Sequence, residues 1–195
     1  MMTGSMKKAF PFLIFAATFS ASLMFLTASS VQSRPPSLYL SGGISDPSGE
    51  LANGVEIGYH GAGKVGFQLE PRTEFLFGAE YHAFRFNRRN LPDLSGRFQS
   101  IMVGFDLKIN LGIPKEPLVP YLIFGGGYAN TDFTDTLTQI PPKNSFKADG
   151  DSRSYFEFGG GFEVKRAFLL FRLVNIFTEQ AAGRFFSIGI GYKLL

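Results

Sequence analysis

The chain has 195 residues, which is enough for one domain of moderate size. It contains no cysteine, and this excludes disulfide bonds, thiolate metal sites and a cysteine nucleophile. Charged residues make up 18% of the chain and hydrophobic residues 45%, a balance that argues against a disordered chain. The formal net charge is only +3 and basic residues adjoin at most in pairs, so we expect no nucleic-acid partner.

Residues 1–33 have the pattern of an export signal. Lys7 and Lys8 precede an uncharged, largely apolar stretch, and small residues follow it. A positive start, an apolar middle and a zone of small residues are the three parts of a secretory signal peptide. We therefore predict a signal peptide that is cleaved after Ser30 or after Ser33. A retained membrane anchor is the competing interpretation, but the apolar stretch is at the short limit for spanning a bilayer.

Residues 34–195 form the predicted mature domain, and apolar and polar residues alternate along it. This period of two is typical of strands with two different faces. The last strand shows it most clearly, because Ile188 and Ile190 alternate with Ser187 and Gly189. The pattern predicts eight strands, at residues 37–44, 55–69, 74–86, 98–111, 119–131, 153–165, 167–178 and 186–194. The second could be one long strand or two halves broken at Gly61-Ala62-Gly63.

The connections between these strands fall into two sets. One set is mostly longer and polar, at residues 45–53, 87–96, 132–152 and 179–183. The other set is shorter, at residues 70–73, 112–118 and 165–166. In an up-and-down barrel the two sets lie at opposite ends, and long loops outside with short turns in the periplasm are typical of outer-membrane barrels. No further domain is expected after the last strand.

Period two alone fits a soluble barrel with an apolar interior as well as a membrane barrel with an apolar exterior. Here the polar face is rich in glycine and serine and carries charges of both signs, which suits a narrow lumen. The other face carries bulky Phe, Leu, Ile, Val and Tyr, which suits contact with lipid. A closed barrel also pairs every backbone group inside a bilayer. We therefore predict an all-β fold, an eight-stranded antiparallel up-and-down transmembrane β-barrel.

The charged residues of the polar face are expected to point into the lumen and to neutralise one another. Eight strands leave an interior just wide enough for side chains, so a plugged lumen is favoured over a polar passage. Arg172 belongs to the polar face too, although its strand alternates poorly. The predicted lumen charge network consists of Glu56, Glu80, Asp106, Lys108, Glu157, Glu163, Lys165 and Lys193.

The last strand also carries a specific motif. Outer-membrane proteins end in an assembly signal that combines a polar residue, a glycine, an aromatic and a hydrophobic residue at fixed spacing. Ser187, Gly189, Tyr192 and Leu194 match this pattern in register, although the usual terminal aromatic residue is missing. The resemblance implies that the barrel-assembly machinery of the outer membrane is a partner of the chain.

The whole mature domain resembles the small outer-membrane β-barrel family of OmpA and OmpX type. The strand ends Ile57-Gly58-Tyr59 and Gly78-Ala79-Glu80-Tyr81 look like those of the family. The resemblance implies a non-enzymatic protein of the bacterial outer membrane with a structural or surface-interaction role. Outer-membrane lipid and lipopolysaccharide are then the expected surroundings, and no cofactor is expected.

His60 and His82 lie on the polar faces of adjacent predicted strands, where they could form a metal pair or an acid/base pair. Lipid A deacylases have a barrel of this size and use His, Ser and Glu, with a His-x-Ser motif. His60 is followed by Gly61-Ala62 and His82 by Ala83-Phe84, so neither matches. We therefore expect no catalytic and no metal-binding residue, and two histidines in an interior hydrogen-bond network.

The long connection at 132–152 is the best candidate for an external contact, because it contains four aspartates and two lysines. Divalent cations, lipopolysaccharide or a host surface are candidate partners, and a solvated loop without a partner is the simpler interpretation. Other functions stay open. One is a narrow porin-like channel or carrier for small solutes, which needs an open lumen. Another is a lipid A-modifying enzyme, which needs a Ser/His/acid cluster on the outward rim. A soluble binding barrel is the rival fold.

Overall fold

The computed structural model describes residues 35–87, 94–112, 117–138, 145–146, 151–177 and 183–194. The predicted signal peptide and its cleavage region lie outside these described residues. Among the described residues, no helix is both long enough and apolar enough to cross a membrane.

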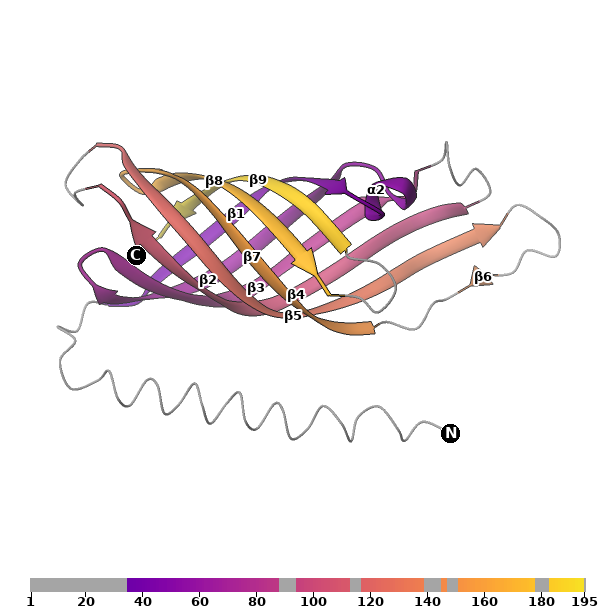
Figure 1. The fold of residues 1–195 in the computed structure, drawn as a ribbon, viewed down its shortest axis with the longest axis horizontal. Helices are drawn as coiled ribbons and strands as arrows, with labels where there is room; N and C mark the ends of the chain where they lie inside the picture. The colour runs from indigo at the N-terminus through magenta and orange to yellow at the C-terminus, as the bar shows by residue number, and fades with distance from the viewer. Residues whose placement is uncertain are drawn as a thin grey trace, which may run out of the picture. The chain divides into compact units, whose positions relative to one another are not determined.

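The described chain is almost entirely strand (Figure 1). Its elements are β1 (Ser37–Ser48), α2 (Leu51–Gly54), β2 (Gly58–Glu70), β3 (Thr73–Arg85), β4 (Leu94–Asn110), β5 (Val119–Thr138), β6 (Ser145–Phe146), β7 (Asp151–Val164), β8 (Ala167–Ile176) and β9 (Gly183–Lys193). The helix α2 and the short strand β6 lie at one end of the barrel, which we call the loop end. The turns at 71–72 and 165–166 lie at the opposite end, which we call the turn end.

All strand pairs are antiparallel and the sheet closes on itself. Each strand pairs with its neighbours in the order β4-β3-β2-β1-β9-β8-β7-β5, and a further pairing of β4 with β5 completes the ring. The first and last strands, β1 and β9, pair from Tyr39 with Lys193 to Ser48 with Arg184. Among the described strands, β6 pairs only with the end of β5, so eight strands form the wall. The predicted eight-stranded up-and-down barrel is confirmed.

The strands differ from the predicted ones mainly at the loop end. β5 runs on to Thr138, well inside the predicted loop, because its backbone continues to pair with β4 up to Leu94. The second strand begins at Gly58 and passes through Gly61 and Gly63 without a break, since β1 and β3 pair with it on both sides. The chain before it forms α2 and one isolated bridge from Val55, so the prediction of a strand from residue 55 was wrong at that end.

The outward face of the wall is apolar over the middle of the barrel. Large side chains on it keep from about a third to two thirds of their surface exposed, up to 68% for Ile190. Such a continuous apolar surface is far larger than soluble monomers expose, whereas a bilayer would cover it. Representative members of this surface are Leu40, Ile44, Phe77, Ile101, Phe105, Leu122, Phe124, Phe158, Ile188 and Ile190. The arrangement is apolar-out, which is the membrane alternative and not the soluble one.

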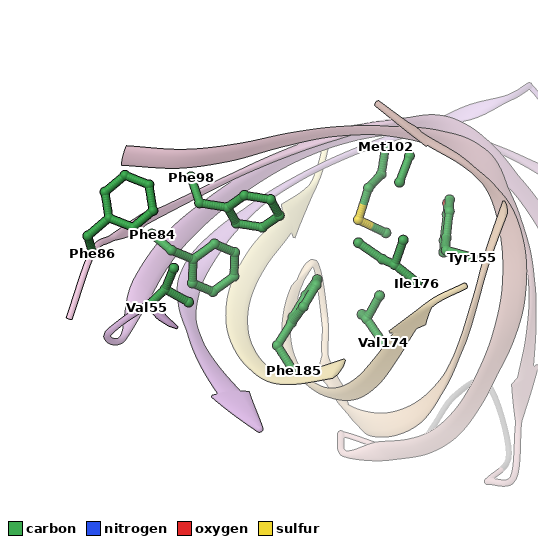
Figure 2. Packing of buried hydrophobic residues seen from close by; sticks show 10 residues of the cluster. Val55, Phe84, Phe86, Phe98, Met102, Tyr155, Val174, Ile176 and Phe185 are labelled. Carbon is green, nitrogen blue, oxygen red and sulfur yellow. The ribbon is translucent and has the colours of Figure 1, made fainter. Parts of the chain in front are cut away.

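The lumen is filled with side chains, and its loop half is apolar. Ten inward residues pack into one cluster there (Figure 2), which we call the loop-end apolar cluster. Its members are Val55, Phe84, Phe86, Phe98, Met102, Ala129, Tyr155, Val174, Ile176 and Phe185. The expectation of a polar lumen therefore fails for this half. A lumen that is too narrow for bulk water must be filled by side chains. Closely packed apolar side chains fill it as well as paired charges do.

Candidate functional site

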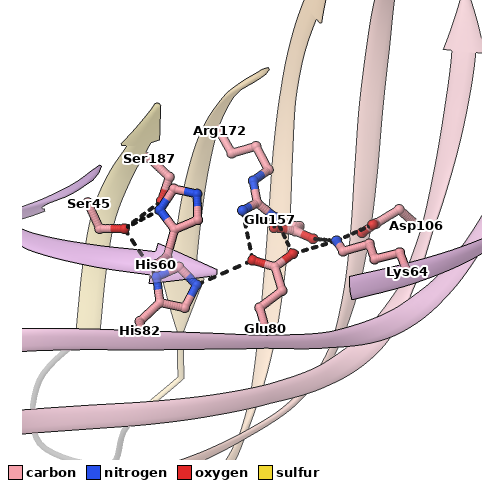
Figure 3. Close-up of polar contacts among 9 residues, drawn as sticks. All are labelled: Ser45, His60, Lys64, Glu80, His82, Asp106, Glu157, Arg172 and Ser187. Carbon is pink, nitrogen blue, oxygen red and sulfur yellow. Dashed lines mark hydrogen bonds and ion pairs between the residues drawn. The ribbon is translucent and has the colours of Figure 1, made fainter. Parts of the chain in front are cut away.

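The middle of the lumen holds a cluster of buried charges around Arg172 (Figure 3). The Arg172 guanidinium donates from Nη2 to Glu80 Oε2 at 2.7 Å and from Nη1 to Glu157 Oε2 at 2.7 Å. Nη1 also donates to Glu80 Oε1, so the contact with Glu80 is bidentate. Such a fork between a guanidinium and a carboxylate combines two charge-assisted hydrogen bonds and fixes the orientation of both groups. All three side chains are at most 3% exposed.

Lys64 is the second cation of this cluster. Its Nζ lies 2.5 Å from Glu80 Oε1, 2.5 Å from Asp106 Oδ2 and 3.2 Å from Glu157 Oε1. Three carboxylates are therefore held by two cations, and we call these five residues the lumen charge cluster. Each buried carboxylate would be costly alone, so its stability depends on the cations that face it.

A hydroxyl at Ser45 joins two histidines beside the charge cluster. Ser45 Oγ lies 3.1 Å from His60 Nδ1, 3.1 Å from His82 Nδ1 and 3.0 Å from Ser187 Oγ. The other ring nitrogen of His82, Nε2, lies 3.3 Å from Glu80 Oε2. A carboxylate only accepts, so Nε2 carries the proton in that contact. The four residues form what we call the hydroxyl–histidine cluster, and Glu80 connects it to the lumen charge cluster.

The pairing register of the strands explains why the four residues of the hydroxyl–histidine cluster lie close together. His60 and His82 are direct partners on β2 and β3, and their rings stack with centroids 5.2 Å apart. Ser45 and Ser187 are direct partners on β1 and β9. Glycines leave room for the His60 ring, since a Cβ added at Gly189 would lie 3.0 Å from His60 Nε2. Four adjacent strands thus bring the cluster together from far apart in the sequence.

A second charged group lies nearer the turn end. Tyr39 donates to Glu74 at 2.5 Å, and Lys193 Nζ lies 3.3 Å from the other oxygen of Glu74. Lys108 forms an ion pair with Glu163, and its Nζ lies 3.8 Å from Glu74 Oε2. The Lys108 ammonium also lies 5.1 Å from the ring centre of Tyr39, within cation–π range. This group shares the lumen with buried apolar residues such as Leu76, Ile123 and Phe168.

The structure brings most of the predicted lumen charges together. Glu80, Asp106 and Glu157 belong to the lumen charge cluster, whereas Lys108, Glu163 and Lys193 belong to the group near the turn end. Two residues do not join either group. Glu56 is exposed and precedes β2. Lys165 is exposed in the turn between β7 and β8, with a φ of 56°.

Three charged residues that the predicted network lacked are central to these groups. Lys64 and Glu74 lie on the inward faces of β2 and β3 and are visible as polar positions in the alternation. Arg172 was assigned to the polar face, but it was left out of the network because the inward face of β8 also carries Phe168 and Leu170, so both faces of this strand are apolar. As a single arginine on an otherwise apolar strand, it could have been placed in the network from the sequence.

The four residues of the predicted assembly signal divide between the two faces of β9. Ser187 and Gly189 point into the lumen, where Ser187 belongs to the hydroxyl–histidine cluster. Tyr192 and Leu194 lie on the outward face and are more than 40% exposed. The motif stays a prediction, and its polar half also contributes to packing of the lumen.

Ser45, His82 and Glu80 are in the order of nucleophile, base and acid that hydrolases use. A hydrolytic site must also admit a substrate. Here Ser45 and His82 are both 0% exposed, and the rings of Phe84 and Phe185 lie against the His82 ring at 6.3 and 4.7 Å between centroids. The cluster faces the lumen and not the outward rim, so it lacks the placement that a lipid-modifying site needs. Within the described residues no group of three His, Asp or Glu side chains is arranged to hold a metal ion.

The closed barrel with an apolar exterior and a filled lumen defines a small outer-membrane β-barrel. No protein-family model and no curated protein matches the chain by sequence. Among solved structures, Neisserial surface protein A matches with a TM-score of 0.51 and 12% identity, over 82% of this chain and 97% of that one. The likeness concerns the fold, and it agrees with the predicted resemblance to barrels of OmpA and OmpX type.

Two further solved structures are similar at a lower score. The N-terminal barrel domain of Pseudomonas aeruginosa OprF has a TM-score of 0.47 and 16% identity, over 81% of this chain and 97% of that one. Ail, the attachment invasion locus protein of Yersinia pestis, has a TM-score of 0.48 and 13% identity, over 82% of this chain and 97% of that one.

Proposed function

We propose that the chain is a non-enzymatic protein of the bacterial outer membrane with a structural or surface-interaction role. Residues 1–33 direct export as a cleaved signal peptide, and the assembly signal on β9 is read by the barrel-assembly machinery. The observation that carries the proposal is the filled lumen, because a wall without an interior passage has only its outward face and its two ends for interactions.

Three layers of side chains block the lumen. The loop-end apolar cluster is followed by the lumen charge cluster, and the group around Lys108 lies nearer the turn end. A cavity of about 30 Å³ lies in the lumen beside Tyr39, Ser41 and Lys64. A volume of this size holds roughly two water molecules and no solute. The sealed lumen supports an interaction role over the alternative of a narrow channel or carrier.

Planar-bilayer recording tests the sealed lumen. We expect the refolded protein to give no stable conductance steps, since three layers of described side chains fill an interior that is only wide enough for side chains. The double substitution F84A/F185A serves as the comparison, because it removes two rings that close the loop half. Stable large steps from the wild type would overturn the proposal in favour of a porin-like channel.

Cysteine labelling tests the location and the sidedness. The chain has no cysteine, so a single introduced thiol reports one position. Glu50→Cys lies at the loop end and Arg166→Cys at the turn end, and both native residues are exposed. With a membrane-impermeant maleimide on intact cells, we expect labelling of E50C alone, and labelling of R166C only after the outer membrane is permeabilised. Labelling of neither on intact cells, or of R166C alone, would contradict the proposal.

The enzyme alternative has its own test. Ser45→Ala removes the hydroxyl that occupies the nucleophile position. We expect mass spectrometry of lipid A to show the same acyl chains from cells with the wild type, the variant or no copy of the gene. Loss of an acyl chain that depends on Ser45 would establish a lipid-modifying enzyme instead.

A further inference from the structure

Two arginines lie side by side on the outward face at the loop end. Arg85 is the last residue of β3, and Arg97 on β4 is its direct register partner. Both are exposed, and Arg85 alternates with the buried Phe84 and Phe86, so it points away from the lumen. Cβ atoms of direct cross-strand partners are roughly 5 Å apart, and like charges at that distance repel.

The described part of the chain leaves this pair with a net positive charge, because Glu56 is the one acidic residue that lines the same cavity. Neither guanidinium forms an ion pair or a side-chain hydrogen bond with another described residue. This differs from the lumen, where carboxylates surround Arg172 and Lys64. An anion from outside the chain would remove the repulsion and would bind to both groups.

A backbone irregularity lies immediately beside the arginine pair. The register between β4 and β5 shifts between Ser95 and Arg97, which is a β-bulge. Gly96 at the bulge has a φ of 144°, a conformation that glycine adopts and that L side chains avoid. Bulges turn the following side chain in a new direction and are frequent beside binding sites. Here the bulge immediately precedes Arg97.

The two arginines line a concave site. A cavity of about 240 Å³ lies against the outer wall, and its lining includes Glu56, Ile57, Tyr59, Ala83, Arg85 and Arg97. This volume is many times the roughly 10–15 Å³ that one water needs, so it accommodates a phosphate group together with several waters. Glu56 is the acidic member of that lining and partly offsets the two positive charges.

The depth of the site on the barrel indicates where the anion comes from. Tyr59 and Ala83 form the next row of the wall toward the middle, and the row after that carries Tyr81 and the 54% exposed Ile101. The arginines thus lie just beyond the apolar surface, with tyrosines between. Tyrosines at the edge of an apolar belt mark the level of lipid headgroups, and long cationic side chains reach from there to phosphates.

We propose that Arg85 and Arg97 bind the phosphate monoester of a lipid in the outer leaflet. A guanidinium presents a planar fork of donors that matches phosphate oxygens, and two forks match the two negative charges of a monoester. The inference rests on the proposed placement in the outer membrane, and it adds the chemical class of a ligand to it.

Native mass spectrometry of the folded mature protein in neutral detergent tests the site. We expect phosphatidic acid, a monoester lipid, to bind the wild type roughly tenfold more tightly than the double variant R85Q/R97Q, about 1.4 kcal/mol. Glu56→Gln should strengthen binding, because it removes a nearby negative charge. The matched control is Arg184→Gln, which removes an exposed arginine at the same end whose partners are Ser48 and Asn175.

Four outcomes would overturn the proposal. R184Q could weaken binding as much as the double variant, which would indicate general charge attraction. Phosphatidylglycerol, a diester lipid, could bind equally well. Inorganic phosphate could compete fully, which would indicate a site for free phosphate. Finally, R85Q/R97Q could bind phosphatidic acid normally while keeping the heat-modifiable gel mobility of a folded barrel. None of these outcomes contradicts the proposed function. The proposed function is contradicted separately, by the labelling patterns described above for E50C and R166C.

Discussion

The two halves of the lumen are filled by opposite chemistry. The loop half contains aromatic and aliphatic side chains (Figure 2), whereas the middle contains two cations and three carboxylates beside two histidines (Figure 3). Side chains fill both halves. The comparison shows that the narrow interior requires side chains that fill it, and that a polar lumen is only one way of meeting this requirement.

The two halves differ in how much their members depend on one another. Contacts between apolar side chains are not directional, so the truncation of one side chain leaves a cavity and removes contacts only locally. In the lumen charge cluster, each carboxylate is stable because specific cations face it, and Glu80 accepts from both Arg172 and Lys64. Removal of one cation therefore affects several buried groups at once.

The largest effect is expected from Arg172→Met. The change leaves Glu80 and Glu157 without the guanidinium that both contact, so we expect a loss of about 3–5 kcal/mol in the free energy of unfolding. Urea-dependent unfolding in lipid vesicles measures it. R184M, at an exposed arginine, should change the free energy little. A loss for R172M below about 1 kcal/mol would show that water replaces the guanidinium, contrary to a dry cluster.

A somewhat smaller effect is expected from Phe185→Ala in the loop-end apolar cluster. The ring is 0% exposed and packs against His82 and Phe84, so its removal should cost about 3 kcal/mol. Phe186→Ala is the matched control, because the neighbouring ring lies on the outward face and is 42% exposed. Equal losses for the two variants in the same vesicles would contradict the assignment of one ring to the lumen and the other to the lipid.

Ser45→Ala should cost less, about 1–3 kcal/mol, because it leaves buried polar groups on His60 and His82 without their shared partner. Ser41→Ala, on the same inward face of β1 and beside the small cavity, is the control and should be close to neutral. The same unfolding measurement compares the two. A neutral Ser45→Ala would indicate that a water takes over the bridging position.

The smallest effect is expected from Glu56→Gln. The sequence placed this residue in the same network as Glu80, but it is exposed outside the lumen. We expect no measurable change in the free energy of unfolding, as for most surface positions. Glu80→Gln, which weakens contacts to Arg172 and Lys64, should be clearly destabilising. Similar losses for both would show that Glu56 does enter the lumen in the folded protein.

Much of the fold could be predicted because a strand in a barrel has one lipid face and one lumen face. A shift of one residue would move Ile188 and Ile190 into the lumen, so the alternation specifies the register as well as the strand. The ends were harder to predict. β5 continues to Thr138 through polar residues, because backbone pairing with β4 continues beyond the apolar surface.

The composition of the candidate site was only partly predictable from the alternation. Alternation assigns Glu80 and Asp106 to the inward face, but it says nothing of which charges meet across the lumen. The alternation in the sequence continues through Glu56, whereas the chain there leaves α2 and makes an isolated bridge from Val55 before β2 begins. Phe84 and Phe185 were not expected inside, because period two does not say that an inward position must be polar.

The seam between β1 and β9 has a consequence for how the barrel folds. Ser45 and Ser187 are separated by 142 residues in the sequence, and their hydrogen bond forms only when the last strand meets the first. Contacts of such long range slow folding, because loop-closure entropy is lost before they form. A nascent chain that lacks β9 keeps one flank of the Ser45 and His60 side chains open. Closure of the wall and completion of the hydroxyl–histidine cluster are therefore one kinetic event, and we expect no half-closed intermediate with an intact interior.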